Sequence, residues 1–529
     1  MRAGKIFIND LEELQLLEKV KTLKITLYGS LAATGKGHHT PQAILLGLEG
    51  SDSETIDTGT IPSRYATIVK DKTLFLGAKH KITYDMDRDM LWRWDQVLKT
   101  HPNGIRFSCF DEDGNLLATN DVGGGFVVND KTKVDENLFY KGVDKKSVHG
   151  ARLHQSHSLA EPNEERDSNS QDDEHPPYPF TSGDSLLNLT RKHNMTISQI
   201  VYDNELFFGL TDDEIHTKLM RIWRVMDDCI RTGVATTETT LPGRLGLRRR
   251  APMLYRRLMR GFYPGVAGPH LSAIGDGSQS YGSIEPPESE KNTSSGRTST
   301  QGQTSLNGRR LARATRVVGS LDHPVLPEPP RKTMIPAVDF LSCYAIAVNE
   351  VNASGGRIVT SPTNGAAGVI PAVLKYIFVS DDPEKSVKTF LLTASAIGML
   401  FKRGSTISAA EGGCQAEVGV ACSMASAGFA ACMGASPETV LQAAEIGIGM
   451  AFQDGLVQVP CIERNSLGAV KAVTAAQLSM AADGVYSVTL DEAIEAMRLT
   501  AADMSVKYKE TSLSGLATTV RIPLTVPAC

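Results

Sequence analysis

The stretch AEVGVACSMASAGFAACMGAS (Ala416–Ser436) decides how this chain folds, because it combines low charge with a high content of small side chains. It approaches the length of a membrane-spanning helix, but Ala, Gly and Ser dominate it rather than Leu or Ile. We therefore predict a tightly packed, buried helix. The flanking segments between Ala394 and Ala482 are also rich in small residues. Such a pattern is typical either of helices crowded around an internal site or of an ordinary Ala-rich bundle.

The bulk composition excludes several classes of protein. A chain of 529 residues is too long for one hydrophobic core, so two or three domains are expected. A net charge of −5 gives no reason to expect nucleic acid or an anionic membrane as the main partner. The N-terminal MRAGKIFINDLEELQLLEKV lacks the apolar core of a signal peptide and is too acidic for a transit peptide. We expect a soluble, intracellular protein.

Two polar stretches divide the chain, EPNEERDSNSQDDEHPP at 161–177 and SSGRTSTQGQTSLNG at 294–308. Both are too polar to bury a core. Short strand patterns and the hairpin pattern IRFSCFDEDGNLLATN precede the first, whereas helical patterns follow the second. We predict an α+β fold in which a small N-terminal α+β domain precedes a larger all-α helical domain. The predicted boundaries are 1–143 for the α+β domain, 144–177 for a polar linker, 178–260 for the start of the helical domain, 261–331 for a disordered insertion and 332–529 for the main helical domain.

Helix starts are readable in the second half of the chain. Ser436-Pro437-Glu438 and Asp382-Pro383-Glu384 each supply an N-cap, a first-turn proline and a first-turn acid. Thr489 and Glu492 have the spacing of a capping box. The segment AVDFLSCYAIAVNEVNASGG at 337–356 predicts a helix that ends at its glycines.

Three cysteines have positions that suit metal binding. Cys414 follows two glycines and precedes a predicted helix, where a thiol pKa is lowered and the thiolate is favoured. Cys461 follows a proline, and Cys529 is the last residue, where a thiol has little packing value unless something ties it down. Thiolates favour iron–sulfur clusters, zinc or Cu(I), and iron–sulfur clusters normally take four cysteines.

The other five cysteines are interpreted as packing residues. Cys422 lies eight residues after Cys414, a spacing unlike the C-x2-C of zinc ribbons or ferredoxins. It and Cys432 lie in Ala-rich helix and are expected to be buried. Cys109, Cys229 and Cys343 lie in segments with apolar periodicity.

The loop YGSLAATGKGHHT (28–40) carries Lys36, His38, His39 and Thr40 at the start of a predicted helix. Adjacent histidines in a glycine-rich loop offer a proton acceptor near neutral pH beside a cation. A phosphate-binding loop is the rival interpretation, but the Walker pattern has a different spacing and ending. We expect one of the two histidines to be structural.

A second candidate is the turn Thr363-Asn364-Gly365, whose amides and side chains can hold a carboxylate near the following helix. A plain turn is the alternative. The basic run Arg244–Arg260 suggests a solvated helix face or an interdomain salt-bridge surface rather than a nucleic-acid site, since no recognition motif accompanies it.

Together these motifs resemble the iron–sulfur-dependent L-serine dehydratases. The likeness covers the chain from about Lys21 to its end outside the two polar stretches. The segments that carry it are YGSLAATGKGHHT, VGGGFVV, LPGRL with RRRA, AVNEVNASGGRIVTSPTNGAAG, AEGGCQAEVGVACSMA, VQVPCIERN, KYKETSLSGLA and the terminal cysteine.

The resemblance implies an enzyme that converts L-serine to pyruvate and ammonia. In that family one iron of a [4Fe–4S] cluster binds serine and helps hydroxide leave, while a base removes the α-proton. By motif, Cys414, Cys461 and Cys529 correspond to cluster cysteines, the last one acting as a tail displaced by substrate. His38 corresponds to the base, with Lys36 and Thr40 in its loop. Thr363, Asn364 and Gly365 correspond to the substrate-binding turn.

The sequence departs from the family pattern at two places. GIGMAFQDGLVQVPC (447–461) is short and lacks a further cluster cysteine, and the sequence begins downstream of an expected Ser-Ser-Ser-His-Thr segment. The alternative is therefore an incomplete or catalytically impaired paralogue that acts as an amino-acid-binding or regulatory subunit. A pyridoxal-phosphate dehydratase has no suitable Ser-x-Lys segment, and a zinc hydrolase has no histidine cluster.

These features also define the expected partners. They are L-serine and further copies of the chain in a homo-oligomer, with no nucleic acid and no membrane. We expect a cytoplasmic location, and a mitochondrial one is compatible with an incomplete N-terminus.

Overall fold

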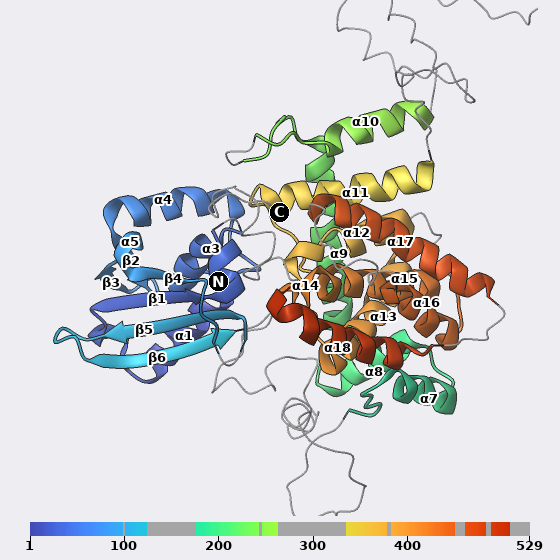
Figure 1. The fold of residues 1–529 in the computed structure, drawn as a ribbon, viewed down its shortest axis with the longest axis horizontal. Coiled ribbons are helices and arrows are strands. Elements are labelled where there is room, and N and C mark those ends of the chain that lie inside the picture. Colours follow the sequence, from blue (N-terminus) through green and yellow to red (C-terminus); the bar gives the residue numbers. More distant parts are fainter. Residues whose placement is uncertain are drawn as a thin grey trace, which may run out of the picture. The chain divides into compact units, whose positions relative to one another are not determined.

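The structure is a computed structural model that describes residues 1–36, 38–98, 101–123, 176–242, 246–262, 335–377, 382–449, 461–482 and 488–507. Within these ranges a small part with both helices and strands precedes a mostly helical part, which confirms the predicted fold class (Figure 1). The predicted linker and insertion lie almost entirely outside the described residues, and the domain boundaries drawn through them remain predictions.

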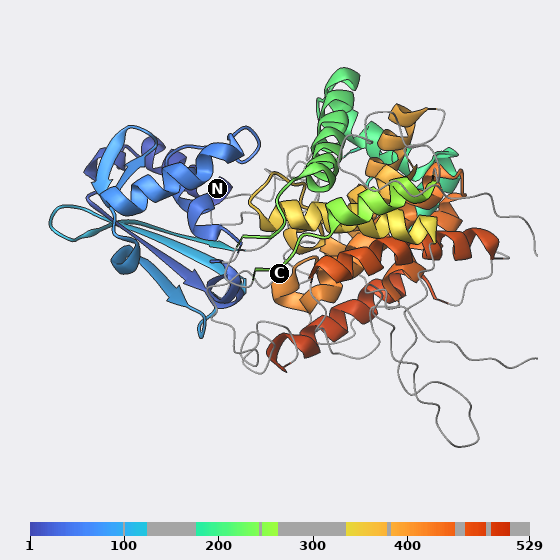
Figure 2. The ribbon, with the colours of Figure 1, turned by 90° about the horizontal axis from the view of Figure 1, so that it is seen from above.

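The strands of the first part form a four-stranded sheet and a separate two-stranded ribbon (Figure 2). The sheet has the order β4-β1-β5-β6, with β1 parallel to β4 and antiparallel to β5. The antiparallel β5–β6 pair is the hairpin that the sequence predicts. The strands are β1 (Thr22–Tyr28), β2 (Thr73–Leu76), β3 (His80–Thr83), β4 (Met90–Arg93), β5 (Asn103–Phe110) and β6 (Leu116–Gly123).

The core of this part follows from the alternation of strand residues. Leu23, Ile25 and Leu27 of β1 are buried, and they alternate with less buried neighbours as period-two pleating requires. The ring of Phe107 on β5 stacks on Phe7 of the first helix, with ring centroids 5.0 Å apart. The helices of this part are α1 (Arg2–Glu13), α2 (Gly29–Thr34), α3 (Thr40–Leu48), α4 (Ile61–Asp71) and α5 (Met86–Asp89), with 3-10 turns η1 (Leu17–Lys19) and η2 (Thr58–Thr60).

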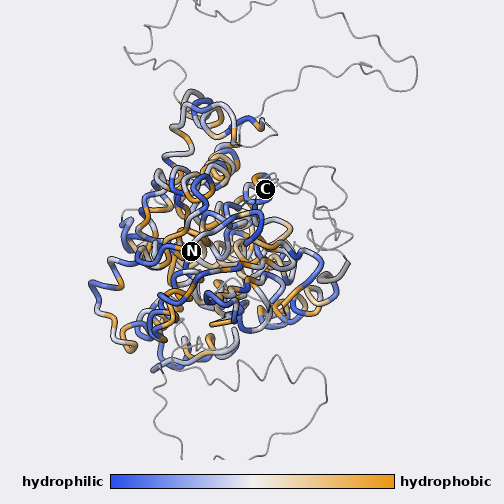
Figure 3. Tube along the Cα trace, turned by 90° about the vertical axis from the view of Figure 1, so that its left-hand side faces the viewer, coloured by the Kyte–Doolittle hydropathy of each residue, from blue (hydrophilic) through white to orange (hydrophobic). Residues whose placement is uncertain are grey.

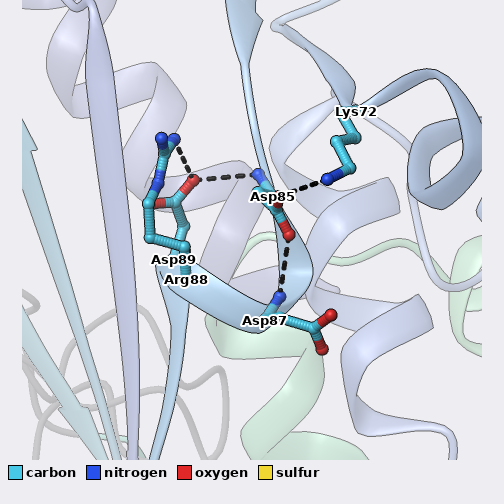
Figure 4. A network of polar contacts seen from close by, with 5 residues as sticks. All are labelled: Lys72, Asp85, Asp87, Arg88 and Asp89. Atoms are coloured by element: carbon cyan, nitrogen blue, oxygen red, sulfur yellow. Dashed lines mark hydrogen bonds and ion pairs between the residues drawn. The ribbon is translucent and has the colours of Figure 1, made fainter.

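A polar network fixes the chain between α4 and β4 (Figure 4). The carboxylate of Asp85 caps α5 by accepting the backbone N–H of Asp87, and it pairs with Lys72, the residue that ends α4. The lysine contact lowers the pKa of Asp85 below its usual value. Buried Asp89 accepts hydrogen bonds from the Arg88 guanidinium and from the Asp85 backbone N–H, so its charge is compensated.

The second part consists of helices and short turns. Hydrophobic and hydrophilic positions are mixed along the whole Cα trace (Figure 3). In α9 the buried residues include Ile215, Trp223, Met226 and Ile230, as expected for an amphipathic helix. The helices are α7 (Gly183–His193), α8 (Ile197–Phe207), α9 (Asp212–Ala235), α10 (Ala251–Phe262), α11 (Pro336–Ala353), α12 (Val369–Ile377), α13 (Pro383–Gly404), α14 (Ala409–Cys414), α15 (Val420–Cys432), α16 (Pro437–Gly449), α17 (Cys461–Ala481) and α18 (Leu490–Lys507); a 3-10 turn η5 (Asn364–Ala366) and a π turn η6 (Gln415–Gly419) complete it.

The predicted helix caps are confirmed. Asp382 accepts the backbone N–H of Lys385 at 3.0 Å. Ser436 Oγ accepts the N–H of Thr439 at 3.3 Å. Thr489 and Glu492 bond reciprocally, at 2.8 and 3.2 Å.

Helix α15 is the centre of the helical part. Every residue from Val420 to Ala430 is buried, which confirms the prediction of a buried helix, and α12, α13, α16 and α17 all pack against it (Figure 1). Small residues make this possible, since a Cβ at Gly428 would lie 2.9 Å from three ring carbons of Phe390. Among the helices of the described residues, none combines the length and apolarity that a bilayer-spanning segment needs.

The glycine contacts of α15 make a testable pair. We expect Gly428→Ala to lower the free energy of unfolding by about 1–3 kcal/mol, because the Phe390 ring must shift. In Gly398→Ala the new methyl instead meets the flexible end of Met424, at 2.9 Å from Cε. That control should change stability by less than about 1 kcal/mol, since alanine also improves helix propensity. Urea unfolding of both variants measures the difference, and equal destabilisation would contradict this packing.

Candidate functional site

The predicted turn Thr363-Asn364-Gly365 is held by a buried carboxylate. It follows a cis Ser361–Pro362 peptide and leads into the 3-10 turn η5. The Thr363 hydroxyl donates a short hydrogen bond to Glu417 Oε1, and the backbone N–H of Gly365 donates to the same oxygen at 2.8 Å. Glu417 is only 8% exposed and lies in the π turn η6. Two segments far apart in sequence therefore meet at one oxygen atom.

Two asparagines complete the support of the turn. Asn465 on α17 donates from Nδ2 to the Gly365 carbonyl at 2.7 Å and accepts the Gly368 N–H at 3.0 Å. Asn352 at the end of α11 donates to Asn364 Oδ1 at 2.6 Å. Because α11, α17 and η6 all contribute, the turn is fixed from three sides.

Cys414 begins the helical stretch that carries Glu417. Gly413 has φ 69° and ψ −170°, which are not helical, so the helical path restarts at Cys414 and continues through η6 into α15. This confirms the predicted placement of Cys414 at a helix start. Its sulfur is buried and accepts a short hydrogen bond from Arg464 Nη1. A guanidinium beside a thiol favours the thiolate, the form that binds metal.

Of the other two predicted cluster cysteines, Cys461 and Cys529, the structure describes only the backbone of Cys461. Cys461 is the first residue of α17, three positions before Arg464, so its backbone is within one helical turn of the residue that contacts Cys414. Its side chain and Cys529 lie outside the described residues, as does most of the shortened segment 447–461. Among the described residues, no group of three or more His, Cys, Asp or Glu side chains is arranged to hold a metal ion.

Four of the other five cysteines are buried as predicted, whereas Cys432 is partly buried and packs against the core. Cys422 donates to the Gly468 carbonyl at 3.4 Å, and burial raises the pKa of its thiol. Burial raises the pKa of Cys229, Cys343 and Cys432 to about 12. The pKa of the buried Cys109 is raised for the same reason. These thiols stay protonated at neutral pH, unlike the thiolates that hold metal.

In the predicted histidine loop the side chains of Lys36 and His38 are exposed, whereas His39 and Thr40 are partly buried. Lys36 is exposed, with its Nζ 5.0 Å from the centre of the Trp92 ring, and His38 is exposed as well. His39 occupies the N-cap position of α3 with φ 56° and makes no side-chain cap hydrogen bond there; its Nε2 is buried without a hydrogen-bond partner among the described residues. This nitrogen is 3.9 Å from the place where a Cβ on Gly355 would lie. Thr40 donates its backbone N–H to Gly35 at 2.9 Å.

Sequence reasoning missed His101 and Glu411. His101 is 8% exposed, and its Nδ1 accepts the backbone N–H of Asn103 at 2.9 Å. Its Nε2 therefore carries the proton and faces Glu411 Oε1 at 3.3 Å. Glu411 precedes Cys414 by three residues. This contact joins the strand-bearing part of the chain to the cysteine segment.

Sequence reasoning also missed Glu417, Arg464 and Asn465. For Glu417 a signal was present, since it is the only charged residue between Gly412 and Ser436. A lone carboxylate in an apolar stretch requires hydrogen-bonding partners or a function. Arg464 and Asn465 follow Cys461 closely, but only the fold reveals their partners.

The basic run is engaged in ion pairs of the helical part. Arg250 pairs with Glu463 on α17 at 2.5 Å, and Arg249 pairs with Glu238. Buried Glu350 accepts the backbone N–H of Arg250 at 2.6 Å, while burial still raises its pKa. The run therefore forms ion pairs, but the partners named here lie within the helical part and not in a second domain.

Comparison with known proteins gives matches over nearly the whole chain. Residues 1–132 match the family described as serine dehydratase beta chain, and residues 192–517 match serine dehydratase alpha chain. An L-serine dehydratase of Streptomyces coelicolor is 39% identical, with 98% of this chain and 94% of the relative covered. L-serine dehydratase 2 of Escherichia coli is 35% identical over the same shares, and an L-serine dehydratase of Helicobacter pylori is 33% identical.

The role of Glu417 can be tested by paired substitutions. In Glu417→Ala the Thr363 hydroxyl and the Gly365 N–H lose their acceptor, which should lower the free energy of unfolding by about 1–3 kcal/mol. Hydrogen exchange at the Gly365 amide should accelerate. Glu417→Gln keeps an acceptor oxygen and should preserve most of the protection. Unchanged exchange at Gly365 in the alanine variant would contradict this arrangement.

Proposed function

The chain belongs to the serine dehydratase family of enzymes, and from this premise we propose that it converts L-serine to pyruvate and ammonia. The observation that supports this most is the Glu417 contact, which places the turn at Thr363 beside the helix start at Cys414. A polar turn held in place beside a thiol is suited to position an amino acid next to a metal centre.

We propose a [4Fe–4S] cluster held by Cys414, Cys461 and Cys529. Two observations support the fit: the buried sulfur of Cys414 lies against a guanidinium, and α17 begins at Cys461 one turn before that guanidinium. When bound, such a cluster supplies a Lewis acid that stabilises the leaving hydroxide, an otherwise poor leaving group. The resting ligand set then includes the C-terminal thiol.

The remaining chemistry falls to the chain's own residues. Thr363, Asn364 and Gly365 form the substrate-side turn, which Glu417, Asn352 and Asn465 hold in position. His38, in a loop with Lys36 and Thr40, takes the α-proton of serine as general base. Loss of water then gives an enamine, which tautomerises and hydrolyses to pyruvate and ammonia. Cytoplasmic location and homo-oligomeric assembly belong to the same proposal.

Metal content and product formation test this proposal together. After anaerobic reconstitution, the full-length protein should contain iron and acid-labile sulfide and should release pyruvate from L-serine. Cys414→Ser should lose both, because it removes a thiolate ligand. Cys422→Ser is the matched control, since a hydroxyl can still donate to the Gly468 carbonyl that the Cys422 thiol contacts.

The outcomes separate the two candidate functions. If the wild-type protein holds neither iron nor sulfide and makes no pyruvate, the enzyme proposal fails, and L-serine binding without turnover would then favour a regulatory subunit. If Cys422→Ser loses iron as completely as Cys414→Ser, the assignment of Cys414 as a ligand is wrong.

The base assignment is tested by comparing the two neighbouring histidines. His38→Asn should reduce kcat roughly 100-fold or more with unchanged iron content, as expected for loss of a general base. His39→Asn should retain most of the activity, because asparagine also suits the N-cap position that His39 occupies in α3. The measurement is steady-state pyruvate formation with serine that carries deuterium at the α-carbon. A larger loss in His39→Asn than in His38→Asn would reverse the assignment.

A further inference from the structure

The first turn of α17 carries the proposed ligand Cys461 and needs support from outside the helix. Cys461 is the first residue of this helix. The four leading N–H groups of any α-helix have no partner within it, so contacts with other segments hold its first turn in place. The position of a metal ligand depends in turn on the groups that support it. The partners of this turn are therefore the groups that can set the position of Cys461.

The two residues directly after Cys461 join α17 to the start of α10. Ile462 is 7% exposed and shares an apolar cluster with Ala251, the first residue of α10. Glu463 lies in the first turn of α17, and its Oε1 is 2.5 Å from Nη1 of Arg250, the residue before α10. Both contacts reach the same neighbouring segment. The first turn of α17 is therefore attached to the N-terminal end of α10.

Arg250 reaches α17 from a backbone that is itself fixed. Its N–H donates to Glu350 Oε1 at 2.6 Å, and the N–H of Ala251 donates to the other carboxylate oxygen at 3.3 Å. Glu350 is fully buried on α11, which packs against α17 (Figure 1). The preceding Arg249 donates from Nη2 to Ser354 Oγ at 2.7 Å, just beyond the end of α11. The guanidinium of Arg250 thus starts from a base that α11 holds.

The next two residues of α17 connect the same turn to the rest of the candidate site. Arg464 donates a short hydrogen bond to the Cys414 sulfur. Asn465 accepts the N–H of Gly368 at 3.0 Å, through its Oδ1. Residues 462–465 therefore link α10, the cysteine segment and the chain that follows the turn at 363–365. A shift of this turn would move Cys461 relative to Cys414.

The exposure of the Arg250–Glu463 pair indicates a local role. The two side chains are 38% and 36% exposed. Ion pairs that water reaches to this extent contribute little to global stability. Such a pair can still select one position of a helix end, because its charges are opposite and its arginine base is fixed. Its loss should therefore displace the turn without unfolding the protein.

We infer that Arg250 is a positioning residue, which through Glu463 holds the first turn of α17, and with it Cys461, in place for the cluster. The ligand role of Cys461 rests on the proposed function, whereas the attachment of α17 does not. This gives the basic run Arg244–Arg260 a part in the site that its sequence alone does not indicate.

The rate at which a chelator removes iron tests this role in the anaerobically reconstituted full-length protein. Arg250→Ala should lose iron roughly 10-fold faster than the wild-type protein, as is typical when a group behind a metal ligand is removed. Arg250→Glu should lose it faster still, because the new carboxylate repels Glu463. Arg250→Lys keeps the positive charge and should retain iron better than Arg250→Ala. The midpoint of urea unfolding should change little in all three variants.

Exchange of the two charges gives a stringent form of the test. The double variant Arg250→Glu with Glu463→Arg restores opposite charges at the same two positions. It should therefore release iron more slowly than Arg250→Glu alone. If the second substitution brings no recovery, the pair does not act through its charges and the inference is wrong.

Arg191→Ala is the matched control. Arg191 pairs at 2.9 Å with Glu438, which lies in the first turn of α16 as Glu463 lies in that of α17. The contact is of the same kind, but that turn carries no proposed ligand. The control should keep the wild-type rate of iron loss. If it speeds iron loss as much as Arg250→Ala does, the effect is a general loosening and the inference is overturned.

Hydrogen exchange in the metal-free protein tests the attachment of α17 without iron. The Gly368 amide donates to Asn465, so its exchange rate reports displacement of this end of α17. In Arg250→Glu the Gly368 amide should exchange faster than in the wild-type protein. In the charge-exchanged double variant its exchange should slow again.

The outcomes separate this inference from the proposed function. Unchanged exchange at Gly368 in Arg250→Glu overturns the inference whether or not the protein holds iron. Equal iron loss from the wild-type protein and Arg250→Glu also overturns it, while the proposed function stands if pyruvate forms. Faster exchange at Gly368 in a protein that holds no iron and forms no pyruvate refutes the proposed function and sustains the attachment of α17.

Discussion

The buried carboxylate of Glu417 is the interaction on which the candidate site depends. A charged group in apolar surroundings is costly unless hydrogen bonds compensate it, and here the compensating donors are the Thr363 hydroxyl and the Gly365 N–H. The same residue lies in the π turn that begins at Cys414. One oxygen atom therefore fixes the substrate-side turn relative to the cysteine segment.

Close helix packing gives this contact a rigid support. α15 continues directly from the π turn and is buried from Val420 to Ala430. Glycines allow its neighbours to approach, for example Gly468 of α17, where a Cβ would lie 2.9 Å from the Cys422 sulfur. Binding sites work best when packing holds their side chains in place before the ligand arrives. The helices rich in small residues therefore hold the site rigid. Their close packing also buries the cysteine thiols of this part.

Much of the fold is predictable from neighbours in sequence. The caps at Asp382 and Thr489 and the β5–β6 hairpin depend on residues a few positions apart, and the structure confirms them. The site depends on partners far apart: Gly365 meets Glu417 and Asn465 across 52 and 100 positions. No local pattern encodes such pairs. Likewise, the sequence places Lys36 in the predicted histidine loop of the site, but in the structure its ammonium group lies over the Trp92 ring.

The central claim is that the turn fixed by Glu417 holds substrate beside a metal centre at Cys414. Mössbauer spectroscopy of protein reconstituted with isotopically enriched iron tests it most directly. We expect L-serine to change the spectrum of one iron site in the wild-type protein, and to leave the spectrum of Glu417→Ala unchanged although its cluster is present. An identical response to L-serine in both proteins would contradict the claim.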